Sequence, residues 1–151
     1  MNELINWDFD DIPPNEVVPW VEDGRDRILS LESAIIALEE EHEAQEPQHY
    51  FAPGMYGREL LIKAGELIVG KIHKHAHINV ISQGEILVVT EFGRARYEAP
   101  FTFVSEPLTK RAVLALEDTI WTTIHATDST DLEVIEEEVI AESYNMIEGD
   151  V

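Results

Sequence analysis

The chain has 151 residues, no cysteine and a formal net charge of −21 at pH 7. A chain of this length fits one domain with a sizeable core, and the lack of cysteine excludes disulfides and thiolate metal ligands. Because 31 acidic residues outnumber 10 basic ones and no stretch of about 18 apolar residues is present, we expect neither nucleic-acid binding nor a membrane span.

Residues 1–48 are expected to form an acidic arm followed by an amphipathic helix. They hold 14 acidic and 2 basic residues and lack the basic and apolar regions of a signal peptide, which indicates a cytoplasmic protein. Two consecutive prolines exclude a helix near the start, so we expect an extended arm, anchored on a neighbour by Trp7 and Trp20 or partly disordered. Apolar residues at helical spacing then predict a helix over 26–42.

Short apolar runs separated by turn residues fill residues 49–127, which carry 8 acidic and 8 basic residues. A turn-rich approach at 49–54 leads into them. The spacing of the runs predicts an all-β domain of eight strands with tight turns, which is typical of a double-sheet jelly roll. We place these strands at 58–62, 67–72, 75–82, 85–90, 94–98, 101–105, 111–116 and 119–126.

Histidines concentrate at two places in this central domain. His73, His75 and His77 alternate along predicted strands and therefore project from one face, and His125 lies near the end of a distant strand. Imidazoles gathered on a barrel wall from two strands are typical ligands of a first-row transition metal. The pattern therefore predicts a metal site, and imidazole suits Zn²⁺, Fe²⁺, Mn²⁺ and Ni²⁺ alike.

Residues 128–151 form a tail with 9 acidic and no basic residues. The segment 130–133, Thr-Asp-Leu-Glu, matches a capping box, and apolar residues follow at helical spacing. We therefore expect an amphipathic helix over 131–143. The simplest role for the acidic ends is to keep the protein soluble; binding of a basic partner or mimicry of DNA charge is the alternative.

The central domain resembles the cupin family. The usual first cupin motif is a glycine, five residues, His-x-His, three or four residues, a glutamate, six residues and a closing glycine. With Gly84 as the closing glycine, His77 takes the place of the glutamate, His73 that of the second histidine and Lys71 that of the first. His125 matches the histidine of the second motif. The resemblance implies a cupin-type double-stranded β-helix.

The resemblance also implies a ligand set for a divalent transition metal. The usual three histidines and one glutamate are replaced by His73, His77 and His125, with His75 as a spare ligand. Three neutral imidazoles leave the ion its full +2 charge, which favours an anionic fourth ligand. Three protein ligands also leave positions open, as in catalytic rather than structural sites.

Strand alternation extends this site to a small-molecule pocket. Side chains that share a face with the histidines, and one from the preceding strand, are expected to line it: Asn79, Gln83, Trp121, Thr123 and Tyr56. Arg58, from the strand that precedes the histidines, is a weaker candidate. For Lys110 and Arg111 we favour an exposed surface pair over neutralisation of an anionic substrate. His42 and His49 lie outside the motif, and we assign them no site role.

Segments at 51–54, 70–77 and 121–125 further resemble a narrower group of small cupin-like proteins common in tailed phages and their bacterial hosts. That resemblance implies a location in the host cytoplasm or in the virion. Because cupins commonly pair through their sheets, we also expect a homo-oligomer.

Three functions follow from these patterns, and they remain open at this point. The first is a metal-dependent enzyme acting on a small anionic metabolite. The second is a non-catalytic phage accessory or virion-associated protein that uses the barrel as a scaffold. The third is a cupin that binds a small molecule without transforming it. The histidines favour the first and third, and the N-terminal arm favours the second.

Overall fold

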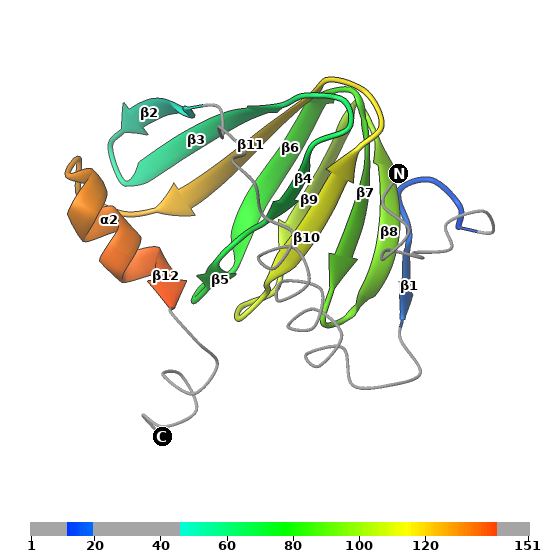
Figure 1. Ribbon diagram of the computed structural model, residues 1–151. Helices are drawn as coiled ribbons and strands as arrows, with labels where there is room; N and C mark the ends of the chain where they lie inside the picture. The colour runs from blue at the N-terminus through cyan, green and yellow to red at the C-terminus, as the bar shows by residue number, and fades with distance from the viewer. Residues whose placement is uncertain (1–11, 20–45, 142–151) are drawn as a thin grey trace.

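The computed structural model describes residues 12–19 and 46–141, which form two large antiparallel β-sheets, a two-stranded sheet and a helix at one end (Figure 1). The helix predicted over 26–42, together with Trp7 and Trp20, lies outside the described residues. Within the described part of the chain, no helix is long and apolar enough to cross a membrane.

Each of the two large sheets has five strands, and all neighbours within them are antiparallel. The first sheet runs in the order β1 (Val17–Pro19), β8 (Gly93–Glu98), β7 (Glu85–Thr90), β10 (Arg111–Ala115) and β4 (Leu67–Val69). The second runs in the order β2 (Gln48–Ala52), β3 (Met55–Ile62), β11 (Thr119–Ala126), β6 (His77–Gln83) and β9 (Phe101–Ser105).

The core lies between the two sheets because alternate side chains of each strand point inward. Along β11, every second residue from Thr119 to His125 is buried. The central cluster draws on both sheets and consists of Ile62, Ile81, Ile86, Val88, Ala95, Tyr97, Val113, Ala115 and Trp121. Two facing sheets with one shared core form the jelly roll expected from the sequence.

All eight predicted strands are present, and those at 85–90, 101–105 and 119–126 have the predicted bounds. Two predictions were wrong in detail. The strand predicted over 67–72 is divided into β4 and the short β5 (Ile72–His73). The approach at 49–54, expected as turns, contributes β2, whose Gln48 to Ala52 pair with β3.

The described parts of the two acidic ends join the barrel through short strands. In the N-terminal arm, β1 pairs with β8, with Val18 opposite Arg94. In the tail, β12 (Ile140–Ala141) pairs with β5, with Ile140 opposite His73. The first pairing adds an edge strand to the first sheet, and the second forms a separate two-stranded sheet.

The C-terminal helix, α2 (Leu132–Val139), is shorter than the predicted 131–143. Its N-cap is Asp131, whose side chain accepts a hydrogen bond from the Glu133 backbone N–H, so the capping box expected from Thr130 is not formed. The helix ends at Val139 because Ile140 turns into an extended conformation and pairs with β5. Pairing with a strand edge therefore overrides the helical pattern of the sequence.

Gly84, the closing glycine of the cupin-like motif, provides a test of the fold. Its φ is +94°, and an added Cβ would lie 2.5 Å from the Asp118 carbonyl oxygen. We expect Gly84→Ala to lower the free energy of unfolding by roughly 2–4 kcal/mol, from left-handed strain plus the clash. Gly65→Ala is the matched control, since its φ is +88° with no atom within 4 Å of the added Cβ. Urea unfolding of both variants should show the larger loss for Gly84; equal losses would contradict this close approach.

Candidate functional site

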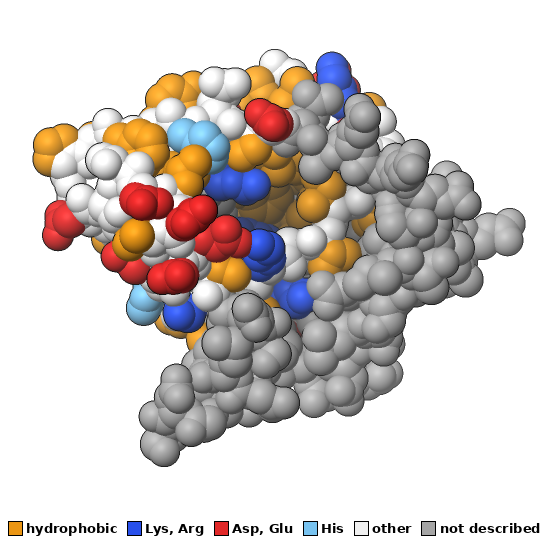
Figure 2. All heavy atoms as spheres, turned by 60° about the vertical axis from the view of Figure 1, so that its left-hand side comes forward, with side chains coloured by type: hydrophobic (Ala, Val, Ile, Leu, Met, Phe, Trp, Pro, Cys, Tyr) orange, Lys and Arg blue, Asp and Glu red, His pale blue; other side chains and the backbone are white. Residues whose placement is uncertain are grey.

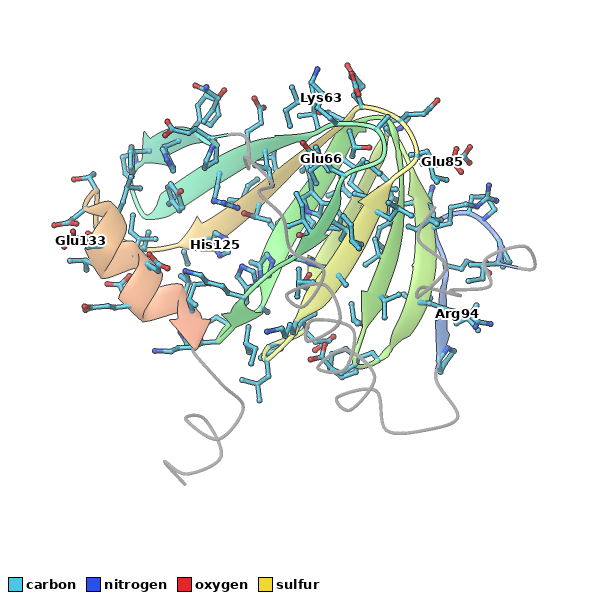
Figure 3. All side chains as sticks on the ribbon, in the orientation of Figure 1. Lys63, Glu66, Glu85, Arg94, His125 and Glu133 are labelled. Atoms are coloured by element: carbon cyan, nitrogen blue, oxygen red, sulfur yellow. The ribbon has the colours of Figure 1, made fainter. Side chains whose placement is uncertain are left out.

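A pocket of about 530 Å³ opens at the end of the barrel covered by α2. Its walls come from β3, β4, β10 and β11, from the segment around β5, and from one side of α2. In Figure 2 the hollow is lined by hydrophobic side chains, basic side chains lie at its mouth, and acidic side chains cover the neighbouring surface. Figure 3 shows His125 on β11 and Glu133 on α2 at this same end of the molecule.

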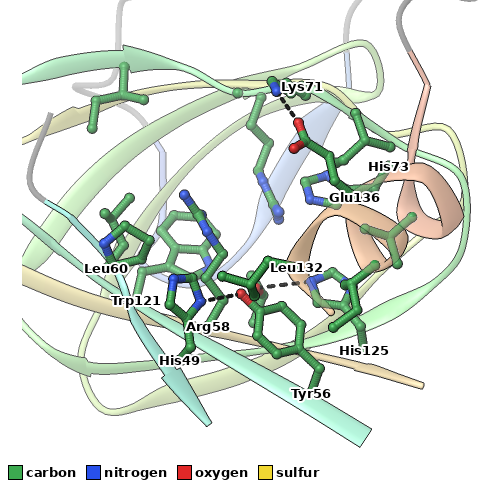
Figure 4. Close-up of a pocket in the computed structure, with 18 of the residues that line it drawn as sticks. His49, Tyr56, Arg58, Leu60, Lys71, His73, Trp121, His125, Leu132 and Glu136 are labelled. Carbon is green, nitrogen blue, oxygen red and sulfur yellow. Dashed lines mark hydrogen bonds and ion pairs between the residues drawn. The ribbon is translucent and has the colours of Figure 1, made fainter. Parts of the chain in front are cut away.

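The three histidines of the cupin-like motif converge beside this pocket, and two of them, His73 and His125, line it (Figure 4). The ring centroid of His77 lies 4.5 Å from that of His73 and 4.7 Å from that of His125, and the other two rings are 5.6 Å apart. His73 is in β5, His77 begins β6 and His125 is near the end of β11. His77 and His125, 48 positions apart, therefore meet because β6 and β11 are neighbours in one sheet.

Arg111 is the charged group at the centre of the site. Its Nη1 donates to Asn79 Oδ1 at 3.1 Å and to Ser105 Oγ at 2.8 Å, and its Nη2 donates to His77 Nε2 at 3.1 Å. The guanidinium carbon lies 4.8 Å from the centroid of the Trp121 ring, a cation–π contact. Only 9% of the residue is exposed. The prediction of an exposed Lys110–Arg111 surface pair was therefore wrong, since both residues are buried.

Arg111 forms no ion pair with any carboxylate among the described residues. Desolvation by burial lowers its pKa to about 10, while Tyr97 and Glu91 act in the opposite direction. It therefore remains charged at neutral pH. A charge taken out of water without a counter-ion is costly, so this arrangement calls for an anion in the adjacent space.

The histidines around Arg111 are held neutral. Burial, followed by the charge of Arg111, lowers the pKa of His73 to about 2 and those of His77 and His125 to about 4. His77 has a defined tautomer, since a guanidinium can only donate hydrogen bonds and Nε2 must accept. Its proton is thus on Nδ1, which donates to the His75 carbonyl oxygen at 3.3 Å.

Two features of the cluster fit a divalent metal. Three imidazoles bound to one ion at about 2.0–2.1 Å place their ring centres roughly 5 Å apart, close to the separations found here. In addition, His73 Nδ1 is buried and has no hydrogen-bond partner within the described part of the chain. The ring spacing and the unpartnered nitrogen of His73 are therefore the two features compatible with a metal.

Arg111 removes that fit. It already occupies the lone pair of His77 Nε2, and an ion bonded to the same lone pair would lie about 1 Å from Nη2. Across residues 12–19 and 46–141, no group of three or more His, Asp or Glu side chains is arranged to hold an ion. In this arrangement, therefore, the residues present do not fit a metal.

Two predicted site residues lie elsewhere. His75 is exposed, because the chain leaves the sheet between β5 and β6 and the alternation assumed from 73 to 77 is interrupted. Gln83 is exposed as well, and its Nε2 donates to the Asp118 carbonyl oxygen. The register of β6 against β11 shifts between Ile120 and Trp121, so the inward alternation does not reach Gln83.

The other predicted pocket residues lie at or just below the pocket. Tyr56, Trp121 and Thr123 line it. Asn79 is fully buried beneath it, where its Oδ1 accepts from Trp121 Nε1 at 2.9 Å and from Arg111. Its role is therefore to hold Arg111 and Trp121 in place rather than to touch a ligand.

Arg111 and His49 are site residues that were not expected from the sequence. His49 lines the pocket, and its Nδ1 lies 2.6 Å from the Tyr56 hydroxyl (Figure 4). For Arg111 a signal was present, since it shares the inward face of β10 with the core residues Val113 and Ala115. His49 carried no such signal, because β2 was not expected as a strand.

Comparisons with known proteins show the cupin fold. No family model and no curated protein matches the sequence. Among solved structures, ectoine synthase from P. lautus matches with a TM-score of 0.53 and 14% identity over 70% of this chain and 82% of its own. KdgF from a Halomonas species (TM-score 0.49, 19% identity, 60% and 91% covered) and a cupin-2 domain protein from Shewanella frigidimarina (0.46, 9%, 64% and 92%) are also similar. At 14% identity the likeness to ectoine synthase shows the fold alone, and it confirms the predicted jelly roll.

Proposed function

We propose that this cupin-fold barrel binds a small organic anion in the pocket between Arg111 and α2. One observation carries the proposal: a buried guanidinium borders the pocket and has no carboxylate partner in the described part of the chain. A bound carboxylate or phosphate oxygen would supply the missing counter-charge through a charge-assisted hydrogen bond.

The other polar groups of the pocket are compatible with an anion. Arg58 and Lys71 line it and add positive charge near the mouth. The neutral rings of His73 and His125 can donate a hydrogen bond from one nitrogen without carrying a charge that must be desolvated. Glu136 is the acidic residue of the lining, and it forms an ion pair with Lys71 (Figure 4).

The remaining wall of the pocket is apolar, which points to a ligand with a hydrocarbon or aromatic part. The apolar side chains of the lining come mainly from β3, β4, β10 and α2: Leu60, Ile62, Ile68, Val69, Val113, Leu132, Ile135 and Val139. Trp121 adds an aromatic face next to Arg111. A few polar groups in a mostly apolar cavity of this size are typical of sites for metabolites.

Among the three functions considered from the sequence, these features favour binding without transformation. A general base acts best when its pKa is near the working pH, whereas those of His77 and His125 are lowered to about 4. The metal-dependent enzyme is less well supported because Arg111 occupies a lone pair that the ion would need. A scaffold role in a phage would not require a buried charge beside an open pocket. The buried guanidinium of Arg111 therefore favours ligand binding over the scaffold role.

A thermal-shift screen tests this proposal. Small carboxylates and phosphates with apolar parts would be compared with their neutral amides and esters. At 100 times its Kd a ligand stabilises by about 2.7 kcal/mol, which raises Tm by roughly 5–10 °C in a chain of this size. Shifts with the anions alone would support the proposal. Equal shifts with the neutral analogues, or none with any anion in the screen, would contradict it.

Removing the acidic residue of the pocket should strengthen binding. Glu136→Gln frees Lys71 and removes repulsion of an anion, and both side chains are more than half exposed, so we expect affinity to rise only about two- to five-fold. The gain should shrink as salt is added. Calorimetry with the anion identified by the screen measures it. Glu133→Gln, on the same helix but outside the lining, is the control and should change affinity less.

The homo-oligomer is proposed on a different surface. On the outer face of the second sheet, Tyr50, Ile78 and Val104 are 44–64% exposed. The register aligns them in one row through Gly57 and Ile124. An apolar row across a sheet favours pairing with a second copy. Sedimentation should give about twice the 17.1 kDa of one chain, and a single 17.1 kDa species would overturn this.

A further inference from the structure

We infer that Arg111 is the permanent cation of the histidine cluster, standing where the three rings would otherwise bind a metal ion. The site then operates without a metal, and deletion of the guanidinium converts it into a metal site. This role of Arg111 is separate from anion binding, because it concerns whether a guanidinium or a metal ion lies beside the three histidines. It does not depend on which anion occupies the pocket.

The first support is the direct competition at His77. The Nε2 lone pair can accept one partner, and Arg111 Nη2 holds it at 3.1 Å. The other ring nitrogen, Nδ1, carries the proton and donates to the His75 carbonyl oxygen. His77 therefore has no second lone pair to offer, and the ion and the guanidinium exclude one another.

The second support is how firmly Arg111 is held. Its guanidinium is bound by Asn79 of β6 and Ser105 of β9, and it contacts Trp121 of β11. Asn79 is in turn fixed by donation to Ser105 Oγ at 2.8 Å and by acceptance from Trp121 Nε1. These groups are buried, so a swing of Arg111 toward solvent would leave Asn79 Oδ1, Ser105 Oγ and His77 Nε2 without its hydrogen bonds.

The third support is the arrangement of the rings themselves. Centroid separations of 4.5–5.6 Å leave His73, His77 and His125 close enough to share one ion. His73 Nδ1, buried and without a partner in the described part of the chain, is a free donor for it. In the present arrangement the described His, Asp and Glu side chains form no group that holds an ion, so the inference is that these three rings close on an ion once the guanidinium is removed.

Co²⁺ is the probe for this inference, because its absorption bands report the number and kind of ligands. The proteins, all without a histidine tag, would be the wild type, Arg111→Met and the double variant Arg111→Met/His77→Ala. We expect Arg111→Met to bind one Co²⁺ per chain at least 100-fold more tightly than the wild type, with loss of this gain in the double variant. Stoichiometric, His77-dependent binding by the wild type would overturn the inference. A folded Arg111→Met protein with no gain would do the same.

A measurement on the wild type alone covers the case in which Arg111→Met does not fold. Nitrogen-15 NMR of the imidazoles should show His77 as the Nδ1–H tautomer, and one equivalent of Zn²⁺ should leave the signals of all three histidines unchanged. Zn²⁺-induced shifts of His73, His77 and His125 together would overturn the inference. Arg111→Lys keeps a positive charge and should resemble the wild type in the Co²⁺ titration. Strong Co²⁺ binding by Arg111→Lys would show that the positive charge is not what excludes the metal.

Discussion

Arg111→Met is expected to weaken binding of the anion by about 100-fold or more. Breaking a buried ion pair by removing one partner typically costs about 3–5 kcal/mol, and 1.4 kcal/mol corresponds to a factor of ten. Arg111 is 9% exposed and makes its hydrogen bonds through fixed, buried partners, so no other described side chain can take over its charge. Methionine keeps much of the volume of the side chain and its contact with Trp121.

Two controls separate this effect from a general change of charge. Lys63→Met removes one positive charge from an exposed pair with Asp118, outside the pocket lining, and should leave affinity nearly unchanged. Arg58→Met removes the exposed guanidinium of the pocket, and a loss of about two- to five-fold is expected. Calorimetry would give all three affinities, and urea unfolding would verify that each variant folds cooperatively.

The ranking of these losses is the decisive result. A loss at Arg58 equal to that at Arg111 would mean that the mouth, rather than the buried guanidinium, binds the charge. Unchanged affinity in a folded Arg111→Met protein would remove the basis of the proposed function. It would leave the Co²⁺ result untouched, because metal exclusion by Arg111 does not require that an anion binds there.

The second large effect is a loss of stability between pH 6.5 and pH 4. His77 and His125 have pKa values lowered to about 4 by burial and by Arg111, against 6.5 for an exposed histidine. Between these values the unfolded chain binds protons that the folded chain excludes, so the stability of the folded state falls as the pH falls. The contribution is fully present above pH 6.5. At pH 5 each of the two histidines should have lost between about 1 and 2 kcal/mol.

Urea unfolding at pH 7 and pH 5 measures this loss in the ligand-free protein. His125→Gln should reduce the difference between the two pH values by about 1–2 kcal/mol, because the substituted side chain no longer titrates. His75→Gln is the control histidine, since it is exposed and outside the pocket, and it should leave the difference unchanged. Equal unfolding free energies at pH 7 and pH 5 in the wild type would show that the two rings are not held neutral by the fold.

The sequence contained enough information for most of the barrel. Short apolar runs between turn residues defined strands such as β7 and β11 to the residue. The four apolar residues of β7 are buried on both faces, whereas β11 buries every second residue. Gly84 marked the tight turn between β6 and β7, where its φ of +94° disfavours other residues. The spacing of the cupin-like motif also identified the three histidines that converge.

Pairing between strands far apart in the sequence explains where the sequence-based predictions were wrong. His73 and His77 meet while His75 points to solvent, because β5 pairs with β12 and β6 pairs with β11, and the chain between them leaves the sheet. The helix α2 ends early for the same reason, as Ile140 joins the edge of β5. Hydrogen bonds to segments far along the chain cannot be read from local periodicity.

By itself, therefore, the sequence determined a β-barrel with clustered imidazoles, since strand alternation and turn residues are local properties. Only the tertiary structure places the Arg111 guanidinium among those imidazoles. Whether Arg111 points inward depends on where β10 begins and on its register against β4 and β7. A shift of one residue would turn it to the opposite face of the sheet, where Ala112 packs with Leu87 and Val89, because neighbouring side chains of a strand face opposite sides.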